Sequence, residues 1–291
     1  MALFFYNSKT GIGLADPLSD GKLGEHTTAS HFHDYGAGWT HVVSTGGNVF
    51  FYHAGKGTAR VANVLWLGRY DVVPADSTLD GFSLGWTIIE KVTADTILFY
   101  NRATGHAVIG RLADGAFSTV SPTMHLKYGW THVQPLLGSI FFYDSQLGLA
   151  ALTQYSEAGA TQQGLGDVFE FTSGYTSLAT YDGSFLVSPG ESWLFAYNKN
   201  TGDGAVYTFQ DGSLVKTQDY PGAFSKGWDV VVRSERYMFF YRSDGAGAVG
   251  RISQGKFATL ASYSNLSPGW THIATPGGQV IDITPHVPHL P

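Results

Sequence analysis

One four-residue motif recurs throughout this chain and constrains its fold more than any other feature. Gly-Trp-Thr-His stands in full at 38–41, 129–132 and 269–272, and altered copies stand at 85–88, 174–177 and 227–230. The aromatic residue of the six copies falls at positions 39, 86, 130, 175, 228 and 270. Self-similarity at this period indicates a repeat protein, in which each unit buries its core only against its neighbours.

Each repeat also carries a short aromatic run, such as 4–6 or 239–241, followed by polar turn residues. Runs of β-favouring residues bounded by Asn, Ser, Thr and Gly predict strands joined by hairpin turns. A small-residue stretch such as 106–112 follows, then a Gly-containing turn and a third run beginning at Phe117. A polar connection leads to the Trp motif and a last strand, such as 41–43. We therefore predict four antiparallel strands per unit.

Six such units predict an all-β protein, a six-bladed β-propeller of four-stranded antiparallel blades, forming a single domain over 1–291. No unit holds an apolar pattern of helical period, which excludes a helical solenoid, and a trefoil would repeat in threes. The segment 279–284 resembles the start of the second unit, so we expect this C-terminal strand to close the ring. The predicted repeats are 1–46, 47–94, 95–137, 138–182, 183–236 and 237–277.

Composition excludes several classes of partner. The net charge is −6 and no run of Lys or Arg forms a basic patch, so we expect no nucleic-acid binding. The chain has no cysteine and therefore no disulfide or thiolate metal site. No apolar run approaches the ~20 residues that span a bilayer, and residues 1–6 do not read as a signal peptide. We expect a soluble protein without membrane insertion, cytoplasmic or secreted without a visible signal peptide.

The Trp motif offers candidate binding residues. In a strand, Trp39 and His41 share one face, where an indole could stack on a sugar and an imidazole could bond a hydroxyl. Alternatively, the Trp packs between blades while His and Thr satisfy backbone groups. The altered copies keep bulk at the aromatic position but place Ile88, Ser177 and Val230 at the His position. The His residues are therefore better functional candidates than the Trp residues beside them.

Arg111 and Arg251 hold matching places in two units. A guanidinium suits sugar hydroxyls or a carboxylate, and it equally suits a surface ion pair with an acid of a neighbouring blade. The predicted ligand-binding residues are Trp39, His41, Trp86, Trp130, His132, Trp228, Trp270, His272, Arg111 and Arg251.

No catalytic motif stands out. The acidic residues, Glu90 among them, share no motif and fall mostly in turns, and the chain has no Gly-x-Ser-x-Gly, P-loop or His-Glu-x-x-His. His31-Phe32-His33-Asp34 could place two imidazoles on one strand face, which is too little to predict a metal site. We therefore predict no catalytic residue, no metal and no cofactor.

Gly-Trp-Thr-His, Phe-Phe-Tyr-Asn and Gly-Arg-Leu together resemble the repeats of tectonin-like propeller lectins, in particular the Photorhabdus lectins. The resemblance covers essentially the whole chain and implies shallow sugar sites at the blades, for fucose or O-methylated sugars. The Photorhabdus lectins look seven-bladed, whereas six is the blade number of the fungal fucose-binding lectins. Those use an Arg, an acid and aromatic residues per site, a triad that does not align here.

The sequence thus predicts a carbohydrate-binding lectin with several weak sites acting together, partnered by glycans, with a homo-oligomer possible. A second hypothesis comes from fungal biosynthetic proteins that look like fucose lectins: a pericyclase-type enzyme with one pocket for a small hydrophobic ligand. The stretch around Trp66 and the loop 184–191 depart from the repeat and suit such a pocket. A protein-interaction scaffold is the third hypothesis.

Overall fold

The computed structural model describes residues 2–24, 32–66, 70–113, 115–136, 138–154, 167–182, 192–210, 213–276 and 281–282. Within these ranges the chain forms strands and turns and no helix. The loop 184–191, His31, His286 and His289 lie outside the described residues, as does the side chain of Trp66.

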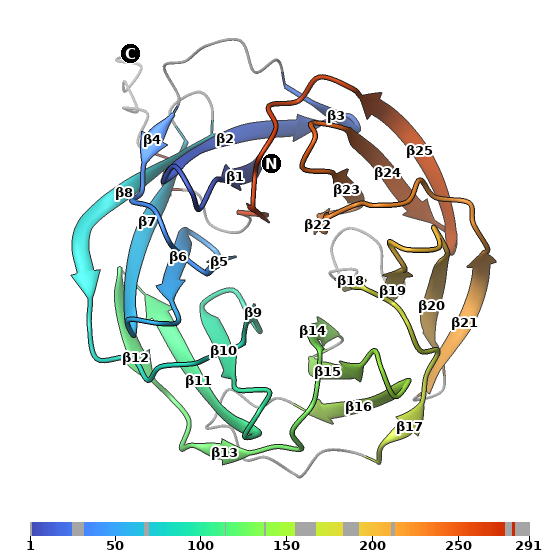
Figure 1. Ribbon diagram of the computed structural model, residues 1–291, viewed down its shortest axis with the longest axis horizontal. Helices are drawn as coiled ribbons and strands as arrows, with labels where there is room; N and C mark the ends of the chain where they lie inside the picture. Colours follow the sequence, from blue (N-terminus) through green and yellow to red (C-terminus); the bar gives the residue numbers. More distant parts are fainter. Residues whose placement is uncertain are drawn as a thin grey trace, which may run out of the picture.

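Six sheets stand around a common centre like the blades of a propeller (Figure 1). The first combines the two ends of the chain: β26 (His272–Ala274), β1 (Ala2–Tyr6), β2 (Ile12–Ser19) and β3 (Lys22–Leu23), with β4 (His33–Asp34) beside β2. The second contains β5 (His41–Ser44), β6 (Asn48–His53), β7 (Thr58–Trp66) and β8 (Tyr70–Leu79). The third contains β9 (Ile88–Lys91), β10 (Thr96–Tyr100), β11 (His106–Ala113) and β12 (Ala116–Thr119), with β13 (Met124–His125) beside β11.

The other three sheets repeat the same meander. The fourth contains β14 (His132–Leu136), β15 (Ser139–Asp144), β16 (Leu149–Gln154) and β17 (Phe169–Glu170). The fifth contains β18 (Ser177–Asp182), β19 (Ser192–Tyr197), β20 (Gly204–Gln210) and β21 (Ser213–Tyr220). The sixth contains β22 (Val230–Ser234), β23 (Tyr237–Tyr241), β24 (Gly247–Ser253) and β25 (Lys256–Tyr263). The prediction of a six-bladed propeller with four-stranded antiparallel blades is confirmed.

The ring is closed by a C-terminal strand, but by an earlier one than the predicted segment 279–284. β26 pairs antiparallel with β1, with Phe5 opposite Ile273. The described part of 279–284 is β27 (Ile281–Asp282), which pairs in parallel with the end of β7. The reason is the phase of the repeat: the strand after each Trp motif is the innermost strand of the next sheet, as His41 opposite Tyr52 shows. The last such strand therefore already completes the first blade, and the observed blades begin at the Trp motif rather than after it.

The repeated residues hold each blade to the loop that enters it. The Gly of all six copies has a positive φ, between 77° at Gly85 and 98° at Gly129, which explains why glycine stands there. The Tyr that ends each aromatic run donates a hydrogen bond to a carbonyl just before the next Trp motif, as Tyr6 does to Gly36 O (2.7 Å) and Tyr241 to Ser267 O (2.9 Å). The Thr of the motif bonds the carbonyl of a Tyr on the adjacent strand, as Thr131 Oγ1 does to Tyr143 O (3.0 Å). These contacts recur from blade to blade because they fix the same turn.

The hydrophobic core is divided into six clusters, each shared by two neighbouring sheets. Trp130 and Phe142 of one blade, for example, pack with Leu98 and Tyr100 of the blade before it. Because the aromatic strands β1, β6, β10, β15, β19 and β23 are almost fully buried, each blade depends on its neighbours for most of its stability.

Candidate functional site

The structure places the predicted Trp residues in the packing between blades. Trp130 is fully buried, Trp86, Trp228 and Trp270 are less than 10% exposed, and Trp39 is half-buried. Each ring packs on the Phe that precedes the Tyr of the aromatic run, with Trp130 and Phe142 centroids 5.9 Å apart and Trp228 and Phe240 also 5.9 Å apart. Four of the five indoles are thus buried against the protein's own aromatic rings, while Trp39 keeps part of its surface exposed.

The three His residues connect neighbouring inner strands. His132 Nε2 lies 3.0 Å from Thr176 O, and His272 Nε2 lies 3.0 Å from Thr40 O. His41 bonds the backbone of Thr87 in the same way. In all three rings Nδ1 faces the Thr hydroxyl of its own motif, at 2.8–2.9 Å. Burial lowers the pKa of each imidazole below its usual value, so the neutral form, donating from Nε2 to a carbonyl, is favoured.

The two Arg residues lie at the surface. Arg111 Nε is 2.9 Å from Asp95 Oδ2, in an ion pair whose two side chains are 39% and 43% exposed. Although the two atoms are close, the Nε–H group of Arg111 does not form a hydrogen bond with this oxygen, so the contact is an ion pair only. Arg251 is exposed at the matching place in the sixth sheet. The structure does not bring these two residues together with the Trp and His positions of one blade.

A different set of polar residues meets at the centre of the ring, on the inner strands β9 and β14 (Figure 1). Glu90 Oε2 lies 3.4 Å from Gln134 Nε2, and Glu90 Oε1 accepts a hydrogen bond from Lys91 N (3.2 Å). Desolvation raises the pKa of Glu90 from 4.5 to about 7, against the lowering effect of Lys91. A carboxyl group with this pKa can accept and release a proton near neutral pH.

One cation, Lys91, follows this carboxyl group in the chain and acts on it electrostatically. Burial lowers the pKa of Lys91, and the charge of Arg233 on β22 lowers it further, while Glu90 opposes the change. Glu90 contacts Gln134 of β14 and is affected by the charge of Lys91. Lys91 is affected in turn by the charge of Arg233, whose guanidinium lies over the ring of Tyr181 (5.3 Å). The positive charges of Lys91 and Arg233 on inner strands make the centre of the ring a candidate binding site for an anionic small molecule.

The sequence alone did not predict this group, because Glu90 shares no motif with the other acids. The strand register shows the signal that was available. Glu90 and Gln134 hold the third position of their inner strands, counted from the residue opposite the Tyr of the aromatic run. The same position elsewhere is Val43, Ala179, Val232 or Ala274. Polar residues at a position that is otherwise apolar, in two neighbouring blades, mark the site.

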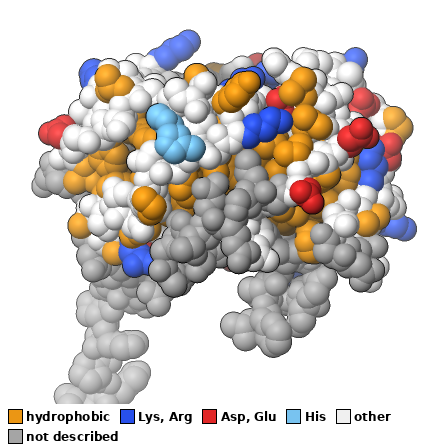
Figure 2. Space-filling view, turned by 90° about the horizontal axis from the view of Figure 1, so that it is seen from below, with side chains coloured by type: hydrophobic (Ala, Val, Ile, Leu, Met, Phe, Trp, Pro, Cys, Tyr) orange, Lys and Arg blue, Asp and Glu red, His pale blue; other side chains and the backbone are white. Residues whose placement is uncertain are grey.

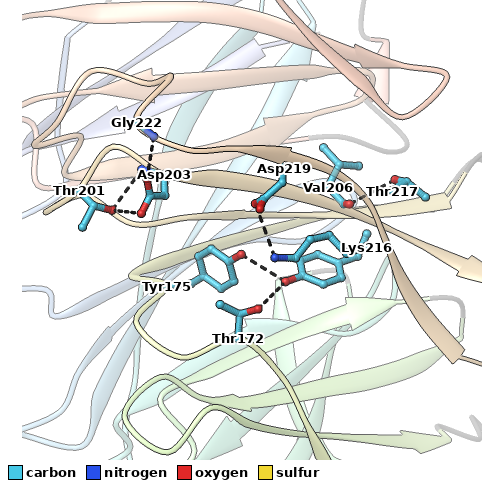
Figure 3. A network of polar contacts seen from close by, with 10 residues as sticks. Thr172, Tyr175, Thr201, Asp203, Val206, Lys216, Thr217, Asp219 and Gly222 are labelled. Carbon is cyan, nitrogen blue, oxygen red and sulfur yellow. Dashed lines mark hydrogen bonds and ion pairs between the residues drawn. The ribbon is translucent and has the colours of Figure 1, made fainter.

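Other polar clusters have structural explanations. Figure 3 shows a network between the fourth and fifth sheets, where Tyr175 replaces the Trp of the motif. Tyr175 Oη lies 3.2 Å from Tyr207 Oη, which lies 3.2 Å from Thr172 Oγ1. Tyr207 holds the place that Gly110 and Gly250 hold in other blades, where Phe117 and Phe257 fill the space above the glycine. At this interface the ring of Tyr207 therefore takes the place that the rings of Phe117 and Phe257 take at the other two.

Two further acids, Asp71 and Asp16, lie outside the inner strands. Asp71 accepts a hydrogen bond from its own neighbour Val72 N (2.9 Å) and lies 3.0 Å from His33 Nε2, which ties β4 to β8. Burial raises the pKa of Asp16 to about 7, but Asp16 lies on β2, away from the inner strands. Among the described residues, no group of three or more His, Cys, Asp or Glu side chains could hold a metal ion. No helix in that part of the chain is long and apolar enough to cross a membrane.

Comparisons with known proteins show the fold and not the family. No family model matches the chain, and no curated protein matches its sequence. Among solved structures, it is similar to a candidate 6-phosphogluconolactonase from Bacteroides uniformis (TM-score 0.57, 13% identity, 92% of this chain and 82% of that one). A candidate 6-phosphogluconolactonase from Bacteroides fragilis (0.55, 11%, 90% and 82%) and the periplasmic gluconolactonase of Pseudomonas aeruginosa (0.55, 11%, 90% and 83%) are also similar. The chain is thus a β-propeller protein of the architecture that these lactonases share.

These findings correct the functional prediction. The similar structures carry lactonase names, so the expected lectin for fucose or O-methylated sugars is wrong, and the comparison supports neither the pericyclase-type enzyme nor the scaffold. The likeness to tectonin-like lectins correctly indicated a propeller built of repeats and does not extend to that family.

Proposed function

We propose that the protein is a hydrolase that opens a lactone at the centre of the ring, with Glu90 as its general base. The observation that carries the proposal is the carboxyl group of Glu90, raised to a pKa of about 7 and placed against Gln134 on adjacent inner strands. The resemblance of the repeats to tectonin-like propellers supports only the architecture of the protein. The lactonase names of similar structures suggest the substrate class, and the site supplies the chemistry.

The reaction needs few parts. Ionised Glu90 takes a proton from a water molecule, whose oxygen attacks the lactone carbonyl. The carbonyl–ring oxygen bond breaks, and the proton returns to the departing oxygen, so that lactone and water give a hydroxy acid. Lys91 and Arg233 would stabilise the negative charge that develops on the carbonyl oxygen during the attack, and the acid that is formed then releases its own proton to the solvent. Gln134 would hold the carboxylate of Glu90 in place.

The site favours a small anionic lactone over a neutral one, because Lys91 and Arg233 place positive charges on the inner strands. A sugar lactone that carries a carboxylate or phosphate group fits this description. Its anionic group would be attracted by the positive charges of Lys91 and Arg233.

The test is the rate of acid release from gluconolactone and its 6-phospho derivative, measured at constant pH above the spontaneous rate. Glu90→Gln should lower kcat/KM by roughly 10²–10⁴-fold, the usual contribution of a general base. Glu170→Gln, which changes an exposed carboxyl group on the outer strand β17, is the matched control and should keep full activity. No hydrolysis of either lactone, or full activity in Glu90→Gln, would contradict the proposal.

A further inference from the structure

Two imidazoles meet on the outer part of the third sheet, far along the blade from Glu90. His106 of β11 and His125 of β13 are opposite each other, with ring centroids 4.6 Å apart and ring planes at 80°. Both side chains are exposed, whereas their strand neighbours Ala107 and Met124 are buried. β13 lies at the rim of the ring in Figure 1. Figure 2 shows the molecule from that side, with histidine side chains in one exposed group.

The backbone brings these two side chains as close as a sheet allows. The adjacent pair carries a hydrogen bond from Leu126 N to Gly105 O (2.8 Å). Because hydrogen-bonded and non-hydrogen-bonded pairs alternate along an antiparallel ladder, His106 and His125 form a non-hydrogen-bonded pair. In such pairs the Cβ atoms are only about 4.5–5.5 Å apart, within the span that one ion can bridge.

The pair is not required by the repeat. The matching positions are Ile12 opposite Asp34 in the first sheet and Leu149 opposite Glu170 in the fourth. An aliphatic residue faces an acid there, and the blade forms without any imidazole. The His106 carbonyl accepts a hydrogen bond from Asn101 N (2.8 Å), and its N–H donates to Thr104 Oγ1 (3.3 Å). Among the described residues, the contact between the two imidazole rings is edge to face and leaves both rings exposed to a ligand.

We propose that His106 and His125 bind a divalent transition-metal ion of the kind that prefers imidazole, such as Cu²⁺, Ni²⁺ or Zn²⁺. Two neutral imidazoles supply two ligands, and water completes the coordination. The present edge-to-face contact requires one ring to turn toward the ion, which exposed side chains do rapidly by changing rotamer. The ion would join β11 to β13 and lies outside the proposed hydrolytic site, so it takes no part in that reaction.

The experiment is calorimetric titration of the full chain with Ni²⁺, Zn²⁺ and Cu²⁺ at pH 7.5. We expect one bound equivalent, tightest for Cu²⁺. His106→Gln and His125→Gln should each weaken binding tenfold or more, while His53→Gln, a change on β6, should not. The bound ion should also raise the Tm of the unaltered protein and not that of His125→Gln.

Other histidines supply the decisive comparison. The chain carries two more near its C-terminus, so the double variant His286→Gln with His289→Gln is titrated in parallel. Binding that survives this double change and fails in His125→Gln supports the proposal. Binding that survives in both His106→Gln and His125→Gln, that fails only in the C-terminal variant, or that occurs with none of the three ions overturns it.

Discussion

Two interfaces between inner strands use the same position of the repeat in different ways. Between β26 and β5, His272 reaches Thr40 O, and the third residue of each strand is apolar. Between β9 and β14, the third residues are Glu90 and Gln134, which contact each other. The first interface satisfies backbone groups and holds blades together. The second places a costly carboxyl group where the fold does not need one, and a group kept at such a cost is the stronger candidate for function.

The two interfaces also respond oppositely to pH. Burial lowers the pKa of His272, so the unfolded chain binds more protons and stability falls as the pH drops below about 6.5. Burial raises the pKa of Glu90, so the folded chain binds more protons and stability falls as the pH rises from 4.5 through about 7. Variants at each interface can therefore be distinguished by the pH at which they change the free energy of unfolding.

The largest effect is expected from the packing that both interfaces share. Trp130→Ala removes a fully buried indole and should cost about 3–5 kcal/mol in the free energy of unfolding. Trp39→Ala, at the same place in another blade but half-buried, should cost less. Urea denaturation of the two variants measures the difference. Equal losses would mean that burial does not separate the copies of the motif.

Replacing Glu90 should stabilise the folded protein above pH 7. Glu90→Gln removes a carboxyl group whose ionisation is disfavoured in the fold, so it should raise the free energy of unfolding by about 1–3 kcal/mol above pH 7. Below pH 4.5 the gain should vanish because the carboxyl group is protonated in both states. Denaturation at pH 4, 6 and 8 tests this trend, and a gain that does not change with pH would refute it.

A smaller effect of opposite sign is expected at the other interface. His272→Ile copies the residue found at this place in β9 and leaves Thr40 O without its bond to the imidazole. The variant should lose about 1 kcal/mol at pH 8, and its deficit should shrink at pH 5, where the unaltered protein is itself weakened. Thermal unfolding at the two pH values measures both effects. A deficit that grows in acid would exclude a neutral imidazole at this position.

The smallest effect belongs to the surface pair. Arg111→Gln removes an ion pair with Asp95 in which both side chains are more than a third exposed, and it should cost less than about 1 kcal/mol. It should also leave lactone hydrolysis unchanged, because Arg111 is not part of the group around Glu90. A large loss of activity would indicate that the active site lies farther out on the third blade than Glu90.

The repeat allowed the fold to be predicted from the sequence but gave no signal for the candidate site. Gly38 and its copies, the aromatic runs and the turns recur because every blade needs the same positive φ and the same Tyr-to-carbonyl bond. Such signals are local and survive in a single sequence. The phase of the blades was not local, since it depends on β26 pairing with β1 at the other end of the chain.

Glu90 carries no motif of its own. It acquires significance only when β9 and β14 are placed side by side and its position in the repeat is compared with Val43 and Val232. The sequence predicted binding at the aligned Trp and His residues because they recur. In the structure these residues pack between blades and bond backbone groups, while Glu90 and Gln134 depart from the pattern.

The most direct test of the central claim is the pKa of Glu90, measured by ¹³C NMR titration of its carboxyl carbon, with Glu90→Gln assigning the signal. The structure predicts a midpoint of about 7 in the unaltered protein. A midpoint at the ordinary value of 4.5 would show that the centre of the ring holds a common surface carboxylate, and Glu90 would not be the base of a hydrolase.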